Sequence, residues 1–236
     1  MGQYAEDVVL RLNDAFERER DSANAASMAA YMRGQFPFFG IPAPRRVAIQ
    51  RIAFAEFRRP INPELTEAVT GLWALPEREF QYAACDILRR NAGTLTPSFL
   101  PTARILIESK SWWDTVDALA ANVVGTIVQN DRSCASAMDH WITDSNTWVA
   151  RAAILYQLKW KTETDTERLF RYCLSRGDER DFFIRKAIGW SLREYSKTDA
   201  KAVRGFIAAH ETRLSGLSKR EALLWLNRSR SLKSLD

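Results

Sequence analysis

The segment "SKSWWDTVDALA", residues 109–120, places Trp113 and Asp117 four residues apart, which is one turn of an α-helix. Pairs in the same register, most of them an aromatic residue followed by alanine, recur at Phe80/Ala84, Trp148/Ala152, Phe183/Ala187 and Ser218/Ala222. From Phe80 to Ser218, successive first members are 33, 35, 35 and 35 residues apart, and the fifth pair keeps only the alanine. A period of this length predicts stacked helical hairpins or triplets.

Helical spacing extends through most of the remaining sequence. In "LPEREFQYAACDILRRN" (75–91), for example, Phe80, Ala84, Ile87 and Leu88 form one apolar stripe. We find no convincing alternation of apolar and polar residues and no hairpin signal. The tetratricopeptide signature residues are also missing. The sequence therefore predicts an all-α protein, an α-solenoid of HEAT-like repeats with a concave face. We expect one domain over residues 1–227 and a short basic tail over 228–236.

Composition restricts the class of protein further. Hydrophobic residues make up 46% and charged residues 27%, as in an ordinary globular protein. The net charge is +5 and the pI is about 9.2, and this positive charge favours an anionic partner such as nucleic acid. No apolar run is long enough to span a membrane, and the first 21 residues mix apolar and charged residues unlike an export signal. Three widely separated cysteines predict neither a disulfide framework nor a zinc site. These features indicate a cytoplasmic protein.

Common catalytic motifs are missing. The chain has no GxxxxGK[ST], GxGxxG or HExxH motif, and its two histidines, His140 and His210, lie 70 positions apart. A Ser-His-Asp arrangement therefore has little support. We predict no metal and no cofactor.

Asp117 departs from the repeat, because the other four copies have alanine at this position. Helix capping is the simplest role for an Asp near a helix start, but Ser111 and Asp114 fit a capping box there. One turn deeper, a carboxylate needs a strong donor, or faces solvent or a ligand. Trp113 shares its face and either fills the core or, through its ring, helps to attract positive charge.

Longer segments resemble the DNA alkylation repair glycosylases of the AlkD type. "SWWDxVD" (111–117), "RAAIL" (151–155) and "KAIGWxLREY" (186–195) are specific when they occur together. Other similar stretches are "AAYMRGQFPFFGI" (29–41), "LWALPEREFQYAACDIL" (72–88) and "LSKREAL" (217–223). The resemblance covers about 200 residues in order. It implies an all-helical stack of HEAT-like repeats, an α-solenoid with a concave basic face that holds duplex DNA.

The resemblance also implies roles for five residues. Asp117 becomes the catalytic carboxylate, and Trp113 and Trp190 become aromatic walls around the damaged nucleotide. Arg151 and Tyr31 become contacts to the DNA. The family removes bases alkylated at ring nitrogen, chiefly N7-methylguanine and N3-methyladenine. The resemblance also implies a monomer. It further implies that the damaged base stays largely stacked in the duplex, so that bulkier adducts would also be accepted as substrates.

Basic residues near these segments are further candidates for phosphate contacts. The ones we expect are Lys110, Lys159, Arg185, Lys186, Arg193, Lys219 and Arg220, and Arg45, Arg46 and Lys197 lie near the same segments. Each of them has an alternative interpretation as plain solvated surface. The family match gives Arg151 the strongest support.

Chemistry supports cationic lesions as substrates. A neutral base needs a general acid, and neither a histidine nor a second carboxylate has suitable spacing. Two other functions stay open at this point: a non-catalytic HEAT-like scaffold that binds DNA or protein, and an RNA-binding solenoid. Against the RNA reader, no base-reading pair recurs in every repeat.

Overall fold

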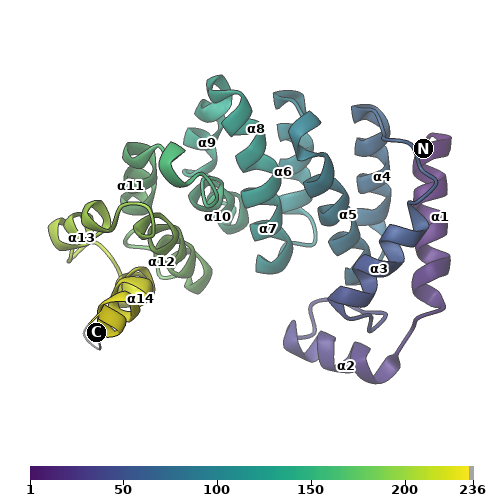
Figure 1. Ribbon diagram of the computed structural model, residues 1–236, viewed down its shortest axis with the longest axis horizontal. Helices are drawn as coiled ribbons and strands as arrows, with labels where there is room; N and C mark the ends of the chain where they lie inside the picture. The colour runs from purple at the N-terminus through teal and green to yellow at the C-terminus, as the bar shows by residue number, and fades with distance from the viewer. Residues whose placement is uncertain (234–236) are drawn as a thin grey trace. The chain divides into compact units, whose positions relative to one another are not determined.

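The computed structural model describes the backbone of residues 1–233, and side chains are described as far as Asn227. Within this part every regular element is helical (Figure 1). The predicted all-α repeat fold is therefore confirmed. The chain divides into two compact units, unit 1 (Met1–Leu95) and unit 2 (Thr96–Asp236). The expected concave basic face stays a prediction.

Unit 1 is built around an aromatic cluster. Its helices are α1 (Gln3–Glu17), α2 (Ser22–Tyr31), α3 (Ala43–Ala53), α4 (Asn62–Ala74) and α5 (Arg78–Asn91). Phe16, Phe39 and Phe80 pack with ring centroids 5.3 to 5.8 Å apart. The fully buried Glu79 carboxylate accepts hydrogen bonds from the backbone N–H groups of residues 39–41, at 2.9 to 3.1 Å. This carboxylate fastens the loop before α3 onto α5.

Unit 2 contains the remaining helices. They are α6 (Leu100–Glu108), α7 (Trp113–Leu119), α8 (Gly125–Asn130), α9 (Ala135–Trp141), α10 (Thr147–Leu155), α11 (Thr166–Ser175), α12 (Phe182–Ser196), α13 (Ala200–Ala209) and α14 (Gly216–Lys233). Short 3-10 turns lie at Pro97–Phe99, Arg132–Cys134 and Lys161–Glu163, and unit 1 ends with one at Ala92–Thr94. In unit 2, α7, α10, α12 and α14 follow one another as packed neighbours, and α9, α11 and α13 form a second row (Figure 1).

The predicted repeat register coincides with helix starts. Phe80, Trp113, Trp148, Phe183 and Ser218 each fall within the first three residues of α5, α7, α10, α12 or α14. The alanines four places later, Ala84, Ala152, Ala187 and Ala222, are fully buried. A small side chain at this position lets neighbouring helices approach closely. Asp117 occupies the equivalent place in α7, so its carboxylate is forced into a helix interface.

Aspartates begin three successive helices of unit 2. The side chains of Asp165, Asp181 and Asp199 accept hydrogen bonds at 2.8 to 2.9 Å from the backbone N–H three residues further on, at the starts of α11, α12 and α13. Such caps satisfy N–H groups that have no partner inside the helix. They fix where these three helices start, and one of them, α12, carries residues of the site described below.

The last helix, α14, extends into the segment that we expect to be a tail. The backbone of α14 runs to Lys233, so the first residues of the expected tail (228–236) continue the last helix. Residues 234–236 lie outside the described residues. The boundaries that we expect for one domain and one tail stay predictions.

Candidate active site

α7 presents Trp113 and Asp117 on one face, because they are its first and fifth residues. The capping box that we expect at Ser111 and Asp114 is wrong. The N-cap is Trp112, with no side-chain cap, and the Ser111 hydroxyl donates instead to the carbonyl of Ile107 at 2.6 Å. Ser111 lies too far before the helix, because α7 begins one residue later than a cap at Ser111 would require.

Asp117 pairs with Arg151 from the next repeat. Both carboxylate oxygens of Asp117 accept hydrogen bonds at 2.7 Å, one from Nε and one from Nη2 of Arg151. Nη1 of Arg151 donates to the carbonyl of Phe183, so α7, α10 and α12 meet at one guanidinium. The Asp117 side chain is 11% exposed and that of Arg151 is 5% exposed. The donor that a buried carboxylate needs is therefore Arg151.

Burial and ion pairing act in opposite directions on Asp117. Burial raises the pKa of the Asp117 carboxyl above its usual value, and the hydrogen bonds and positive charge of Arg151 oppose that rise. Nearby Asp114 adds a smaller upward effect on the pKa. The bidentate geometry is that of an ionised carboxylate held in one orientation.

The pair borders a pocket of about 360 Å³. The lining residues are Trp113, Asp117, Arg151, Phe182, Phe183, Lys186, Trp190, Arg193 and Glu221. Four of them are aromatic, with Trp113 and Trp190 half-buried and Phe182 49% exposed. The structure therefore brings the three expected catalytic residues, Asp117, Trp113 and Trp190, into one pocket together with Arg151.

A neighbouring aromatic cluster supports the pocket. The ring of Phe183 lies 5.1 Å from that of Trp112 and 4.9 Å from that of Trp148, centroid to centroid. Trp112 and Trp148 are themselves 5.7 Å apart. These three rings join the starts of α7, α10 and α12. Aromatic packing thus fixes the helix ends that carry the pocket residues.

Glu221 is a pocket residue that sequence reasoning missed. We found no second carboxylate with suitable spacing, yet Glu221 of α14 lines the same pocket as Asp117. The repeat contains a signal for it. Arg151, Lys186 and Glu221 occupy one repeat position, three residues after Trp148, Phe183 and Ser218, and all three line the pocket. A charged residue at this position of successive repeats is therefore informative.

The basic residues that we expect to contact DNA divide into two groups. Lys186 and Arg193 line the pocket. The others lie outside its lining, namely Lys110, Lys159, Arg185, Lys219 and Arg220. Lys159 donates to the Asn122 side chain, and Lys219 donates to the Glu211 carbonyl at 2.9 Å. Tyr31, 72% exposed, belongs to unit 1 at the end of α2. The roles of these residues in DNA binding stay predictions.

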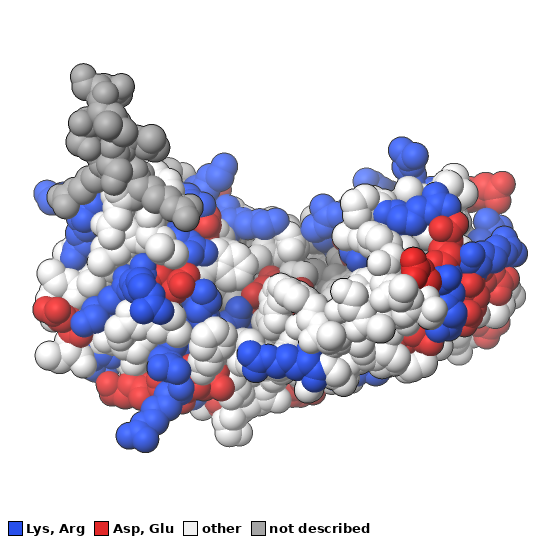
Figure 2. All heavy atoms as spheres, turned by 90° about the horizontal axis from the view of Figure 1, so that it is seen from below, with Lys and Arg blue, Asp and Glu red and all other residues white. Residues whose placement is uncertain are grey.

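Figure 2 shows one face of the molecule with its charges coloured. In the part of this view that shows unit 2, blue basic groups border white uncharged surface, with red acidic groups among them. The acidic groups compensate part of the positive charge here.

Fold and site together define a class: an all-helical repeat protein with a carboxylate–arginine pair in an aromatic pocket. A family model described as DNA alkylation repair enzyme matches residues 12–226. The chain therefore belongs to the DNA alkylation repair enzyme family.

Comparison with solved structures agrees with this assignment. A structure titled "Predicted DNA alkylation repair enzyme from Enterococcus faecalis" is 32% identical, with a TM-score of 0.81. The match covers 88% of this chain and 96% of that one. The search of curated proteins gave no match. Among the described residues, no helix has the length and apolar character needed to cross a membrane.

Proposed function

We propose that this protein is a DNA glycosylase acting on duplex DNA. It hydrolyses the N-glycosidic bond of cationic alkylated bases, namely N7-methylguanine, N3-methyladenine and bulkier adducts. The observation that carries the proposal is the Asp117 carboxylate, held by Arg151 in a pocket with four aromatic side chains. Family membership supports a role in the repair of alkylated DNA.

Asp117 has the chemistry that the reaction needs. Glycosidic hydrolysis passes through an oxocarbenium-like state with positive charge on the sugar. Arg151 uses one lone pair on each Asp117 oxygen, so a second lone pair on each is available for an attacking water. The negative charge of the carboxylate stabilises the sugar cation, and preorganised charges of this kind are worth several kcal/mol.

The indoles of Trp113 and Trp190 add to this stabilisation. Both belong to the pocket lining, and the face of an indole attracts a cation by about 0.5 to 2 kcal/mol. The second carboxylate, Glu221, is bound through both oxygens to cations, which is not the arrangement of a proton donor. The site therefore suits leaving groups that already carry positive charge.

We also propose that the damaged base is not flipped out of the duplex. The family resemblance is the basis for this proposal. A lesion that stays in the duplex is not limited in size by a closed pocket, so bulky adducts would also be substrates. A structure of the complex with the lesion stacked would support it. A lesion enclosed in the pocket of Asp117 would refute it.

The experiment is base release from duplex DNA containing N7-methylguanine, detected by liquid chromatography with mass detection. Wild type and Asp117→Asn are compared at one salt concentration, with Asp139→Asn, another Arg-paired Asp of unit 2, as control. We expect release by wild type and the control, and a loss of at least about 100-fold in Asp117→Asn. Equal release by all three would remove Asp117 from the mechanism. Tight DNA binding without release of either methylated base would favour the scaffold alternative.

A further inference from the structure

Glu221 links two cations at the edge of the pocket. Its Oε1 lies 3.0 Å from Nζ of Lys186, and its Oε2 lies 3.0 Å from Nη1 of Arg193. Only 13% of the Glu221 side chain is exposed, against 38% for Lys186 and 26% for Arg193. One largely buried carboxylate from α14 therefore compensates two cations of α12.

The two cations flank an aromatic wall. Lys186 lies four residues before Trp190 and Arg193 lies three residues after it, so all three share one face of α12. Lys186, Arg193 and Trp190 line the pocket with Asp117. Without Glu221, two uncompensated positive charges would stand beside the place where the reaction develops positive charge.

The position of Glu221 is built into the packing of α12 on α14. A Cβ at Gly189 would lie 2.4 Å from Cβ of Glu221 and 2.9 Å from the carbonyl oxygen of Ser218, so only glycine permits this approach. The Ser218 hydroxyl also donates to the carbonyl of Arg185 at 2.9 Å. These contacts hold the backbone of Glu221 against α12, directly beside Trp190.

We propose that Glu221 is a positioning residue that also sets the charge of the site, an inference that rests on the proposed function. It holds Lys186 and Arg193 on either side of Trp190 and cancels much of their charge at the reacting sugar. The pocket lining has three cations and two carboxylates, and loss of Glu221 leaves three cations and one carboxylate. That loss has opposite effects on two steps. It opposes a cationic transition state, and it strengthens attraction to phosphate.

The test is Glu221→Gln, with single-turnover base release and binding of an undamaged duplex both measured. We expect base release to slow about tenfold, because an uncompensated positive charge repels the sugar cation. Binding tightens at low salt, and the plot of log affinity against log salt steepens by about one to two as freed cations reach phosphates. Glu194→Gln is the matched control, because Glu194 of α12 pairs with Lys197 at 2.5 Å and does not line the pocket. Its base release is expected to equal that of wild type.

A charge-balanced variant separates electrostatics from structure. Lys186→Gln combined with Glu221→Gln restores the wild-type net charge of the pocket, and we expect it to recover most of the lost rate. Slow release, weaker binding and a lower melting temperature in both variants would show a merely structural role and overturn the inference. A wild-type rate in Glu221→Gln with unchanged binding would also overturn it. If wild type releases no base, the proposed function fails, and the affinity and salt dependence for undamaged duplex alone decide the role of Glu221.

Discussion

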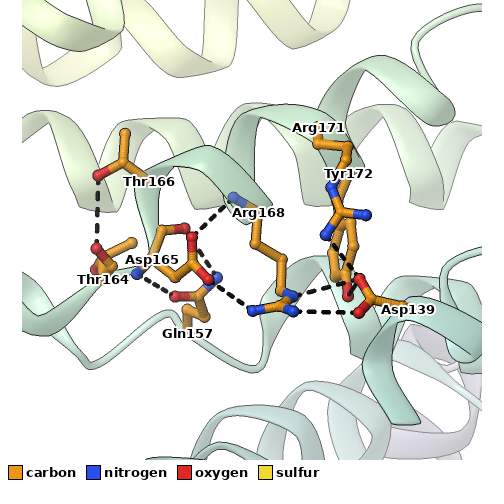
Figure 3. Close-up of polar contacts among 8 residues, drawn as sticks. All are labelled: Asp139, Gln157, Thr164, Asp165, Thr166, Arg168, Arg171 and Tyr172. Carbon is orange, nitrogen blue, oxygen red and sulfur yellow. Dashed lines mark hydrogen bonds and ion pairs between the residues drawn. The ribbon is translucent and has the colours of Figure 1, made fainter. Parts of the chain in front are cut away.

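Two of the Asp–Arg clusters that join successive repeats of unit 2 lie in different rows of helices. Asp117 of α7 binds Arg151 of α10 in the row that forms the pocket. Asp139 of α9 binds Arg168, Arg171 and Tyr172 of α11 in the second row (Figure 3). The distances are similar, 2.7 Å in the first cluster and 2.8 to 3.3 Å in the second.

The surroundings of the two carboxylates differ. The Asp139 side chain is 31% exposed, and although partial burial raises its pKa, hydrogen bonds from Arg168 and Tyr172 lower the pKa of Asp139 to about 2. Asp117 is 11% exposed, has one cation as partner, and has its pKa raised by burial. An ion pair between repeats therefore does not by itself mark a site. The aromatic pocket beside Asp117 makes the difference.

Removing one arginine from each cluster should produce the largest difference in the free energy of unfolding. Arg151→Met leaves a buried carboxylate without its partner, and we expect it to lower the free energy of unfolding by about 3 to 5 kcal/mol. Arg168→Met should cost about 1 kcal/mol, because Arg171 and Tyr172 still bind Asp139. Urea denaturation measures both. Equal losses would mean that the two environments do not differ energetically.

Gly→Ala substitutions in α12 and α13 should change stability in opposite directions, because the two glycines differ in how closely other helices pack against them. Gly189→Ala in α12 meets Glu221 and Ser218 at less than 3 Å, and we expect a loss of about 1 to 3 kcal/mol. Gly205→Ala in α13 meets nothing within 4 Å, and we expect a gain of about 0.5 to 1 kcal/mol because alanine favours the helix. Thermal unfolding of both variants checks the signs. A stabilised Gly189→Ala would show that α12 and α14 can separate freely.

Acid should remove the contribution of the Asp139 cluster to the free energy of unfolding at low pH. Its pKa is lower in the folded protein than the ordinary value near 3.8, so its contribution is present above about pH 4 and is lost as pH falls towards 2. Allowing for solvent screening, we expect this contribution to be about 1 to 2 kcal/mol. The difference in unfolding free energy between wild type and Asp139→Asn should therefore shrink across that range. A difference that is constant from pH 5 to 2 would contradict the lowered pKa.

Asp117 should lose its charge at a higher pH than Asp139, because the pKa shifts of the two carboxyls are opposite in sign. Because burial raises its pKa, the ionised form that the proposed reaction needs is lost at a higher pH than for an ordinary Asp. We expect base release under single-turnover conditions to fall with acid at a pH where an ordinary Asp is still ionised, while the fold, followed by circular dichroism, is intact. The acid limb should lie above pH 4. A rate independent of pH down to 4 would contradict this prediction.

Much of the fold was predictable because it depends on local periodicity. Trp113, Trp148 and Phe183 recur at helix starts, and buried alanines follow Trp148 and Phe183 one turn later. The exception, Asp117, pointed to the candidate site for the same reason, since a carboxylate at a position where the other repeats have alanine needs a partner. The prediction of a capping box was wrong because the Ser111 hydroxyl donates a hydrogen bond to the carbonyl of Ile107 in the preceding helix. A side-chain hydroxyl has several local acceptors, and spacing does not decide among them.

By itself the sequence determined the helical class, the register of the repeat, the family resemblance and the exceptional status of Asp117. These properties depend on residues close together in the chain or on a fixed period. Only the tertiary structure decided that Arg151 is the donor for Asp117, and that Glu221 shares the pocket and binds Lys186 and Arg193. Such pairings depend on how one helix is rotated against the next. That rotation follows from close contacts such as Gly189 against Ser218 and Glu221, which the spacing of residues along the chain does not express.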